Sequence, residues 1–378
     1  MYRFSFPTLI HFGAGVRKQM PDFLKGKNIK RPLIVTDKGV AALPLCREIE
    51  LSLKDVGLQV QTFSGIWGNP VKSQVNEGVK AFKGHDADAI IGLGGGAALD
   101  VAKAIALMAT HPGDLFDYED EKPGALSVDG PIPYWIAVPT TSGTGSEVGR
   151  SSVISDDQTH VKKIIFSPKL LAQAVFADPE LTLNLPGPVT AATGMDALTH
   201  CVEAYLAKGY HPICDGIALE GIRLASQSLV KTVKEPQDIE ARSQMMMCSM
   251  MGAIAFQKGL GVTHSCAHAL GTVVDMHHGL ANGVMIDYAL KINTGVAAER
   301  FKNMAVTAGL KDRTPQGFLQ WLTDLKTATN IPQNLSKAGV TKDKIDKLVD
   351  LAVQDICHLS NPRAVTREDF KAIFSEAF

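Results

Sequence analysis

Histidine spacing in one short stretch of the chain points to a metal centre. Residues 261–283 contain four histidines: His264, His268, His277 and His278. Earlier in the chain, Asp196 and His200 are four residues apart, and His264 and His268 repeat that spacing. Residues four apart on a helix share one face. We interpret the two fragments as the halves of one divalent-metal site.

The donor types indicate what kind of metal site this is. Imidazole and carboxylate ligands without thiolate suit Zn²⁺, Fe²⁺, Ni²⁺ or Co²⁺, and a mixed set of this kind is typical of a catalytic site with an open position. Any single histidine could instead be a core residue or a helix cap, although that explains the whole group poorly. Spacing alone does not choose between His264 and His268, or between His277 and His278, and it leaves a fifth ligand open.

A glycine-rich segment predicts a phosphate-binding loop. Residues 92–103, GLGGGAALDVAK, follow an apolar run and open a helical pattern. Glycines let the backbone approach phosphate oxygens, and the helix N-terminus adds free N–H groups. Gly92, Gly94 and Ala97 match the degenerate dinucleotide fingerprint, but this loop follows the third predicted strand rather than the first. The alternative is a triple-glycine turn that serves tight packing alone.

Two further segments favour a nucleotide cofactor. Asp37 ends the first buried strand, where a carboxylate could bind ribose hydroxyls and repel a 2′-phosphate, so that NAD is favoured over NADP. The alternative is an aspartate that only serves the turn. Residues 138–148, VPTTSGTGSEV, offer many hydroxyls and glycines that could hydrogen-bond a cofactor, or could form a polar surface loop.

Hydrophobic periodicity divides the chain into an α/β half and a helical half. The first half alternates short apolar runs with helical patterns, which predicts a parallel sheet covered on both faces. The expected strands are residues 2–12 (an edge strand or hairpin), 32–37, 58–63, 87–93 and 133–138, and the expected helices are 43–56, 71–83 and 97–108. After residue 187 the expected elements are helices only: 188–207, 212–233, 239–257, 283–293, 297–308, 314–327 and 342–355. We therefore expect domains at 1–186 and 187–378.

Composition excludes several classes of protein. A chain of 378 residues favours two domains, and a net charge of −1 gives no reason to expect nucleic acid or an acidic membrane surface as a partner. The six cysteines are scattered without a CxxC pair, which argues against a disulfide framework and a thiolate zinc finger. The N-terminus lacks a signal-peptide pattern, and no apolar run could span a bilayer. We expect a soluble, cytoplasmic protein.

Taken together, these motifs resemble the iron-dependent (group III) alcohol dehydrogenase family over nearly the whole chain. The segments that carry the resemblance are Phe6-Pro7-Thr8, Phe12-Gly13, Asn69-Pro70, residues 94–103, 139–148, 178–182 and 193–200, His264 to Gly271, residues 278–282 and Asn361-Pro362-Arg363. The metal fragments are the most specific of these. The family's fold implies a Rossmann-like dinucleotide-binding domain followed by a helical metal-binding domain.

The resemblance also implies roles for the histidines. It places the metal on Asp196, His200, His264 and His278. His268 then lies beside the metal, near the substrate and nicotinamide, as a residue that helps to relay a proton. His277 receives no role.

The resemblance also implies which residues bind the cofactor and line the substrate pocket. The implied cofactor-binding residues are Asp37, Asn69, Gly94, Gly95, Gly96, Ala97, Asp100, Thr140, Thr141, Thr144 and Lys162. Ser151, Phe256 and Cys357 match positions that line the family's substrate pocket. Ala97 departs from the serine that is usual there, which removes one hydroxyl but leaves the backbone donors. Arg150 could meet a substrate carboxylate or sulfonate, although we favour a structural or surface role.

The implied reaction is hydride transfer between NAD(H) and a small alcohol or aldehyde, with Fe²⁺, or alternatively Zn²⁺, as Lewis acid. A diol, glycerol, semialdehyde or hydroxy-acid dehydrogenase of the same family is an alternative. A lyase of the dehydroquinate synthase type would need clustered Lys and Arg near the metal, which the sequence lacks there. A non-catalytic scaffold would give no function to the phosphate-binding loop or to the metal site. The family also implies a homodimer, in which the N-terminal strand could pair across the interface.

Overall fold

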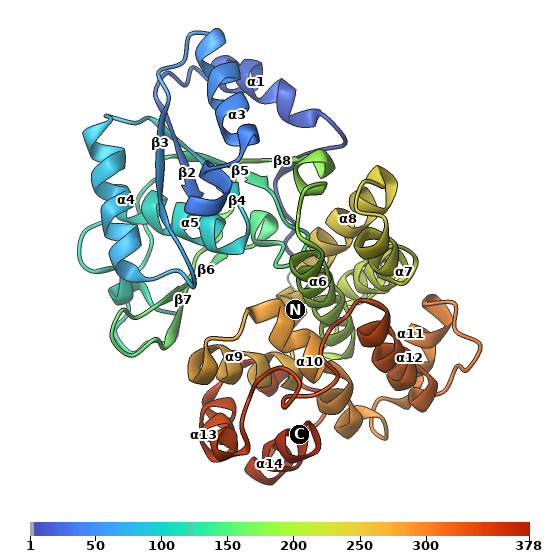
Figure 1. Ribbon diagram of the computed structural model, residues 1–378. Helices are drawn as coiled ribbons and strands as arrows, with labels where there is room; N and C mark the ends of the chain where they lie inside the picture. The colour runs from blue at the N-terminus through green and yellow to red at the C-terminus, as the bar shows by residue number, and fades with distance from the viewer. Residues whose placement is uncertain (1–3, 121) are drawn as a thin grey trace. The chain divides into compact units, whose positions relative to one another are not determined.

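A computed structural model describes residues 4–120 and 122–378 of the chain (Figure 1). The described residues form two compact units. The sheet unit comprises residues 6–141 and 146–182, and the helical unit comprises residues 183–378 together with the short segments 4–5 and 142–145. Residues 138–148, the hydroxyl-rich loop, are therefore divided between the units: residues 142–145 belong to the helical unit, and the two ends of the loop belong to the sheet unit.

The sheet unit is built on one parallel sheet of six strands in the order β1-β8-β5-β4-β2-β3. Its strands are β1 (Leu9–Phe12), β2 (Pro32–Asp37), β3 (Gln61–Ile66), β4 (Ala89–Gly94), β5 (Tyr134–Pro139) and β8 (Ala174–Ala177). A separate antiparallel hairpin is formed by β6 (Ser151–Ser155) and β7 (Lys162–Phe166). The helices of this unit are α1 (Met20–Gly26), α2 (Lys38–Ala41), α3 (Pro44–Asp55), α4 (Lys72–Gly84) and α5 (Gly96–Thr110).

Helices cover both faces of this sheet, which explains why its central strands are apolar throughout. Every residue of β4 is buried. Alternate residues of the central strands, such as Ile91 and Leu93, join a core cluster with residues of α1 and α3. The opposite face meets α5, where a Cβ on Gly92 would lie 3.1 Å from the side chains of Leu99 and Ala102. The sequence of β4 therefore places a glycine where α5 comes closest.

The helical unit contains α6 (Gly187–Leu206), α7 (Pro212–Lys234), α8 (Ile239–Ala255), α9 (Val262–Val274), α10 (His278–Leu290), α11 (Ala298–Thr307), α12 (Pro315–Ala328), α13 (Ile345–Gln354) and α14 (Arg367–Glu376). Its core cluster draws residues from all of these helices. Helices α6 and α10 are nearly uniformly buried, because α10 packs against both α6 and α9 (Figure 1). A helix that is buried on all sides occupies the centre of such a unit, and its few polar side chains must find partners there.

The predicted fold class, a dinucleotide-binding α/β part and a helical part, is confirmed. Part of the first predicted strand, residues 2–3, lies outside the described residues, and β1 is an edge strand that pairs in parallel with β8 rather than a hairpin. The hairpin β6–β7, strand β8 and helix α14 were missed, since β8 has only four residues and β6 and β7 carry polar residues. Helix α10 begins at His278, five residues before the predicted start.

Candidate metal centre and cofactor site

Helix α6 positions the first two residues of the predicted metal site. Asp196 and His200 lie one turn apart in the interior of α6, and both are buried. The Asp196 Oδ1 and His200 Nε2 atoms are 3.9 Å apart, so that both side chains point to the same place, as the four-residue spacing predicts.

Helices α9 and α10 bring the other two histidines to α6. His264 lies in the first turn of α9, and His278 is the first residue of α10. The start of α10 lies directly against α6, because a Cβ on Gly279 would be only 2.4 Å from the carbonyl oxygen of Ala192 and 3.2 Å from Cβ of Asp196. Only glycine permits this approach, which brings His278 Nε2 to 3.4 Å from Asp196 Oδ1.

The four donor atoms fit a single divalent cation. One ligand atom each from Asp196, His200, His264 and His278 lies within 4.8 Å of all the others. Metal–ligand bonds of about 2.0–2.2 Å in a tetrahedral site separate neighbouring donors by about 3.4 Å, and the distances of 3.4 and 3.9 Å from Asp196 Oδ1 lie close to that value. The set contains three imidazoles, one carboxylate and no sulfur.

A buried carboxylate, Glu203, orients one of these histidines. Its Oε2 accepts a hydrogen bond of 2.7 Å from His264 Nδ1 and another of 3.0 Å from the backbone N–H of Gly261, while its Oε1 accepts from the N–H of Thr263 at 2.6 Å. Burial opposes the ionisation of Glu203, but the hydrogen bonds and charge from His264 and Thr263 hold the pKa of Glu203 below its ordinary value. The carboxylate thus fixes the tautomer of His264 and leaves Nε2 as the donor toward the centre.

Asn282 closes the opposite side of the cluster. Its side-chain amide donates a hydrogen bond of 2.7 Å to Asp196 Oδ1 and lies 3.3 Å from Nε2 of both His264 and His278. Sequence reasoning gave no role to Glu203 or Asn282. The signal was present, since Glu203 follows His200 by three residues and Asn282 follows His278 by four, which places each on the face of its helix that carries the histidine.

Burial favours the neutral form of His200. Desolvation lowers the pKa of His200 to about 4, although the nearby Asp196 carboxylate partly opposes this shift. A neutral imidazole is the form that donates a lone pair to a metal. The ring of Phe256, one of the predicted substrate-pocket residues, lies 5.1 Å from the His200 ring, beside the cluster.

His268 lies next to the cluster but outside it. Its ring stacks on that of His278 at a centroid distance of 5.3 Å, and its Nδ1 forms a hydrogen bond of 2.7 Å with Asp355 Oδ2. Cys357 Sγ is 4.0 Å from the same nitrogen. His277 is the N-cap of α10, where its Nδ1 accepts a hydrogen bond from the N–H of Leu280, so that this histidine has a structural role.

The predicted phosphate loop joins β4 to α5 in the sheet unit. Gly94 ends β4 with φ +149°, Gly95 is the N-cap of α5, and Gly96 and Ala97 form its first turn. A cavity of about 290 Å³ opens here. Its lining residues are Asp37, Lys38, Gly39, Ile66, Trp67, Gly68, Gly95, Ala97 and Ala98. The structure thus brings the predicted ribose-binding carboxylate and the glycine loop to one cavity, which the first turn of α5 borders.

Two predicted cofactor residues also have structural partners. Asp37 caps α2, because its Oδ1 accepts a hydrogen bond of 2.9 Å from the N–H of Val40. Asp100 lies further along α5, where its Oδ1 accepts a hydrogen bond of 2.6 Å from Ser146 Oγ and its Oδ2 one of 3.1 Å from the N–H of Val153. Asp100 therefore ties α5 to the hydroxyl-rich loop and to β6.

The remaining predicted residues lie in both units. In the sheet unit, Thr140 donates its backbone N–H to the Gly94 carbonyl at 3.0 Å, and the Thr141 side chain lies 3.2 Å from where a Cβ of Gly95 would be. Asn69 lies between β3 and α4, Ser151 begins β6 and Lys162 begins β7. Thr144 belongs to the helical unit. Arg150 lies over the ring of Phe166 at 5.9 Å, which agrees with the structural role that we favoured.

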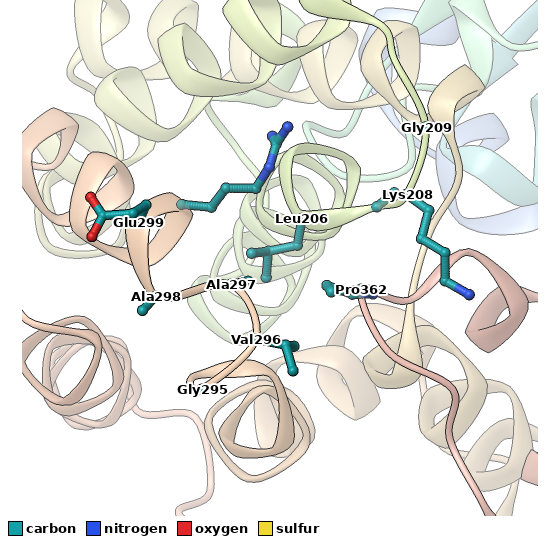
Figure 2. Close-up of a pocket in the computed structure, with 11 residues that line it drawn as sticks. Leu206, Lys208, Gly209, Gly295, Val296, Ala297, Ala298, Glu299 and Pro362 are labelled. Carbon is teal, nitrogen blue, oxygen red and sulfur yellow. The ribbon is translucent and has the colours of Figure 1, made fainter.

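A cavity in the helical unit contains none of the predicted site residues. It measures about 510 Å³ and is lined by residues 206–209, 295–300 and Pro362. Figure 2 shows Lys208 and Glu299 on opposite sides of this cavity.

Comparison with known proteins places the chain in a family. A family model described as "Iron-containing alcohol dehydrogenase" matches residues 7–179, and a model described as "Fe-containing alcohol dehydrogenase family, C-terminal" matches residues 190–378. The chain belongs to the iron-containing alcohol dehydrogenase family. The resemblance noted in the sequence is confirmed, and with it the assignment as an oxidoreductase that acts on alcohols.

Individual members of the family are similar over their whole length. A 4-hydroxybutyrate dehydrogenase of Cupriavidus necator is 37% identical, with 98% of each chain covered. An NAD-dependent methanol dehydrogenase of Bacillus methanolicus is 34% identical, with 100% of each chain covered. The crystal structure of a 1,3-propanediol oxidoreductase matches with a TM-score of 0.95 at 34% identity, again with 100% of each chain covered. No helix within residues 4–120 and 122–378 is both long and apolar enough to cross a bilayer.

Proposed function

We propose that this protein is an NAD(H)-dependent alcohol dehydrogenase, or aldehyde reductase, whose divalent metal is held by Asp196, His200, His264 and His278. The observation that carries the proposal is the cluster of one carboxylate and three imidazoles, whose donor spacing fits one cation and which Glu203 and Asn282 hold in place. A divalent cation bound there would polarise the oxygen of the alcohol or aldehyde as a Lewis acid. Iron is the metal in the family's description, and Zn²⁺ is the alternative by intrinsic affinity.

His268 is the residue that we assign to proton transfer. Because Asp355 accepts a hydrogen bond from Nδ1, Nε2 is the nitrogen that remains to take or give the proton of the reacting hydroxyl. We assign Phe256, beside His200, and Cys357, beside His268, to the substrate pocket, together with Ser151.

The cofactor is assigned to the sheet unit. NAD bound there would carry the hydride. The first turn of α5 borders the cavity, where its N–H groups would bind the pyrophosphate, while Asp37 lines the same cavity and would bind ribose hydroxyls. The remaining positions that we assign to the cofactor are Asn69, Asp100, Thr140, Thr141, Thr144 and Lys162.

We further propose a cytoplasmic homodimer with domains at 1–186 and 187–378. None of the six cysteines forms a disulfide bond, which fits a reducing compartment. Strand β1 forms an edge of the sheet and exposes Leu9 and Phe12, so that a second copy could pair with it.

The proposal is tested by metal removal and reconstitution. Protein stripped of metal under anaerobic conditions should lose aldehyde-dependent NADH oxidation, and it should regain the activity with one equivalent of Fe²⁺. Methanol, 1,3-propanediol and 4-hydroxybutyrate, the substrates in the names of three relatives, form the first substrate panel with NAD and NADP. Equal activity of the stripped and reconstituted protein would contradict the proposal.

A further inference from the structure

A second group of metal-binding side chains lies beside the first. It consists of His268 on α9, Asp355 directly after α13, and Cys357 at the start of the following 3-10 turn, and one donor atom of each lies within 4.8 Å of the other two. The group has access to solvent, since the side chains of His268 and Asp355 are 21% and 16% exposed. The deeper donors of the first cluster, Asp196 and His264, are 1% exposed.

The donor types of this second group suit a cation that prefers sulfur. Nitrogen, oxygen and thiolate sulfur together are ligands of Zn²⁺ and of heavier cations of the same kind. Donors on one such cation are about 3.3–3.8 Å apart. Here His268 Nδ1 is 2.7 Å from Asp355 Oδ2 and 4.0 Å from Cys357 Sγ, so that shifts of less than about 1 Å would bring the donors to that spacing.

The carboxylate of this group is already oriented for a ligand. Asp355 Oδ1 accepts hydrogen bonds from Ser265 Oγ at 2.7 Å and from the backbone N–H of Cys357 at 2.9 Å. These two bonds leave Oδ2 facing His268. Secondary partners of this kind hold a carboxylate ligand in place when a metal binds.

We propose that His268, Asp355 and Cys357 form a second, inhibitory site for a thiophilic divalent cation such as Zn²⁺ or Cd²⁺. When the cation binds, the proton on His268 Nδ1 moves through solvent to Nε2, so that the neutral imidazole donates its Nδ1 lone pair, and the proton on Cys357 Sγ passes to solvent. The bound cation also breaks the hydrogen bond to Asp355 that keeps His268 Nε2 as the proton-exchanging nitrogen. The inhibitory consequence rests on the role proposed above for His268, whereas the binding itself does not.

Cadmium titration of the iron-loaded enzyme tests the binding. The first cluster contains no sulfur, so cadmium that displaced iron there would produce no thiolate-to-cadmium charge-transfer band in the ultraviolet. We expect the wild-type protein to develop this band up to one thiolate per chain. The band should be absent in Cys357→Ser and unchanged in Cys46→Ala, a matched control in which a buried thiol of the sheet unit is removed.

The absence of the band in wild-type protein, or its persistence in Cys357→Ser, would overturn the proposal. A second measurement on wild-type protein needs no variant: Zn²⁺ should protect Cys357 from alkylation by iodoacetamide, as read by peptide mass spectrometry. Unchanged labelling of Cys357 at saturating Zn²⁺ would overturn the proposal as well.

The inhibition is tested by zinc titration of dehydrogenase activity, with each protein compared with its own rate before zinc is added. Half-inhibition of Cys357→Ser should require more zinc than wild type by at least the roughly tenfold factor that even an outer-shell partner is worth. Equal sensitivity of the two proteins would overturn the inhibitory role. Failure of this site is distinguishable from failure of the proposed function: an active enzyme without the cadmium band refutes the site alone, whereas a cadmium band in an inactive protein refutes the proposed function alone.

Discussion

The metal cluster and the glycine loop differ in the groups that they offer to a ligand: side chains in the first and backbone N–H groups in the second. In the metal cluster, side chains do the work, and buried polar partners such as Glu203 and Asn282 fix each donor atom. In the glycine loop the backbone supplies the chemistry, because the first turn of α5 borders the cavity, Gly95 has no side chain and Ala97 has only a methyl group. The first region should therefore be sensitive to side-chain chemistry and the second to backbone geometry.

The loop illustrates the difference through Ala97. The resemblance to the family implies serine at this position, yet α5 begins at Gly96 with alanine there, and the first turn of a helix leaves its N–H groups without partners inside the helix. In the metal cluster a comparable change, such as the replacement of a ligand histidine, would remove a donor atom that nothing else supplies.

The largest expected effect comes from the replacement of a ligand, His264→Ala. Loss of one donor should abolish stoichiometric metal binding and lower kcat/KM by roughly 10³-fold, since Lewis-acid stabilisation is worth several kcal/mol. The matched control is His277→Ala, which removes the cap of α10 and should cost about 1 kcal/mol of stability. Metal analysis and steady-state kinetics measure both variants. Retention of one metal per chain by His264→Ala would contradict the assignment of His264 as a ligand.

A buried carboxylate of the sheet unit should give that unit a pH-dependent stability. Burial raises the pKa of Glu147 from 4.5 to about 7, although Lys103 partly offsets the shift. The folded protein therefore favours the protonated acid, and wild type loses stability as pH rises from about 4.5 to about 7.

Glu147→Gln stays neutral throughout this range, so that its advantage in free energy of unfolding should grow with pH and reach about 3 kcal/mol above pH 7. Chemical denaturation at several pH values measures this difference. A difference between the two proteins that does not change with pH would contradict the prediction.

The role of the buried partner in the metal cluster is tested by Glu203→Gln. An amide cannot accept all the hydrogen bonds that Glu203 receives from His264 and the backbone, so that His264 should lose its fixed tautomer. Metal affinity should fall by roughly 10–100-fold, while NADH affinity stays unchanged. Glu220→Gln on the surface of α7 is the control. Competition with a chelator measures the affinity, and equal values for Glu203→Gln and wild type would refute an orienting role.

The smallest expected effect is in the loop, where Gly94→Ala changes the backbone without removing a functional side chain. Gly94 has φ +149°, and a Cβ there would lie 2.7 Å from Cβ of Ala98. A strain of about 1–2 kcal/mol should weaken NADH binding by roughly tenfold and leave metal affinity unchanged. Gly84→Ala, whose Cβ would meet nothing within 4 Å, is the control. Fluorescence titration with NADH measures the effect, and wild-type affinity in Gly94→Ala would show that the backbone does not limit binding.

The sequence predicts the fold, and it picks out side chains that the structure brings close together, for physical reasons. Apolar strands such as β2 and β4 and the regular helical patterns after residue 187 are local signals, and the histidine pairs carry their spacing in the sequence. Spacing could not show which of His277 and His278 points to the metal cluster, because this depends on where α10 begins and on the close contact of Gly279 with α6.

The partners of the site residues were harder to predict. Asp355 lies eighty-seven positions from His268, and only the packing of α13 beside α9 brings the two together. No local pattern reports such a contact. The hairpin β6–β7 was missed for the opposite reason, since its residues form a small local structure with weak apolar alternation.

The central claim is that one divalent metal lies among Asp196, His200, His264 and His278. Anomalous X-ray diffraction from iron-loaded crystals, measured at the iron absorption edge, tests it most directly. We predict one iron per chain bound to the Asp196 carboxylate and to Nε2 of the three histidines. Iron bound elsewhere, or a coordination shell that lacks one of these three imidazoles, would contradict the claim.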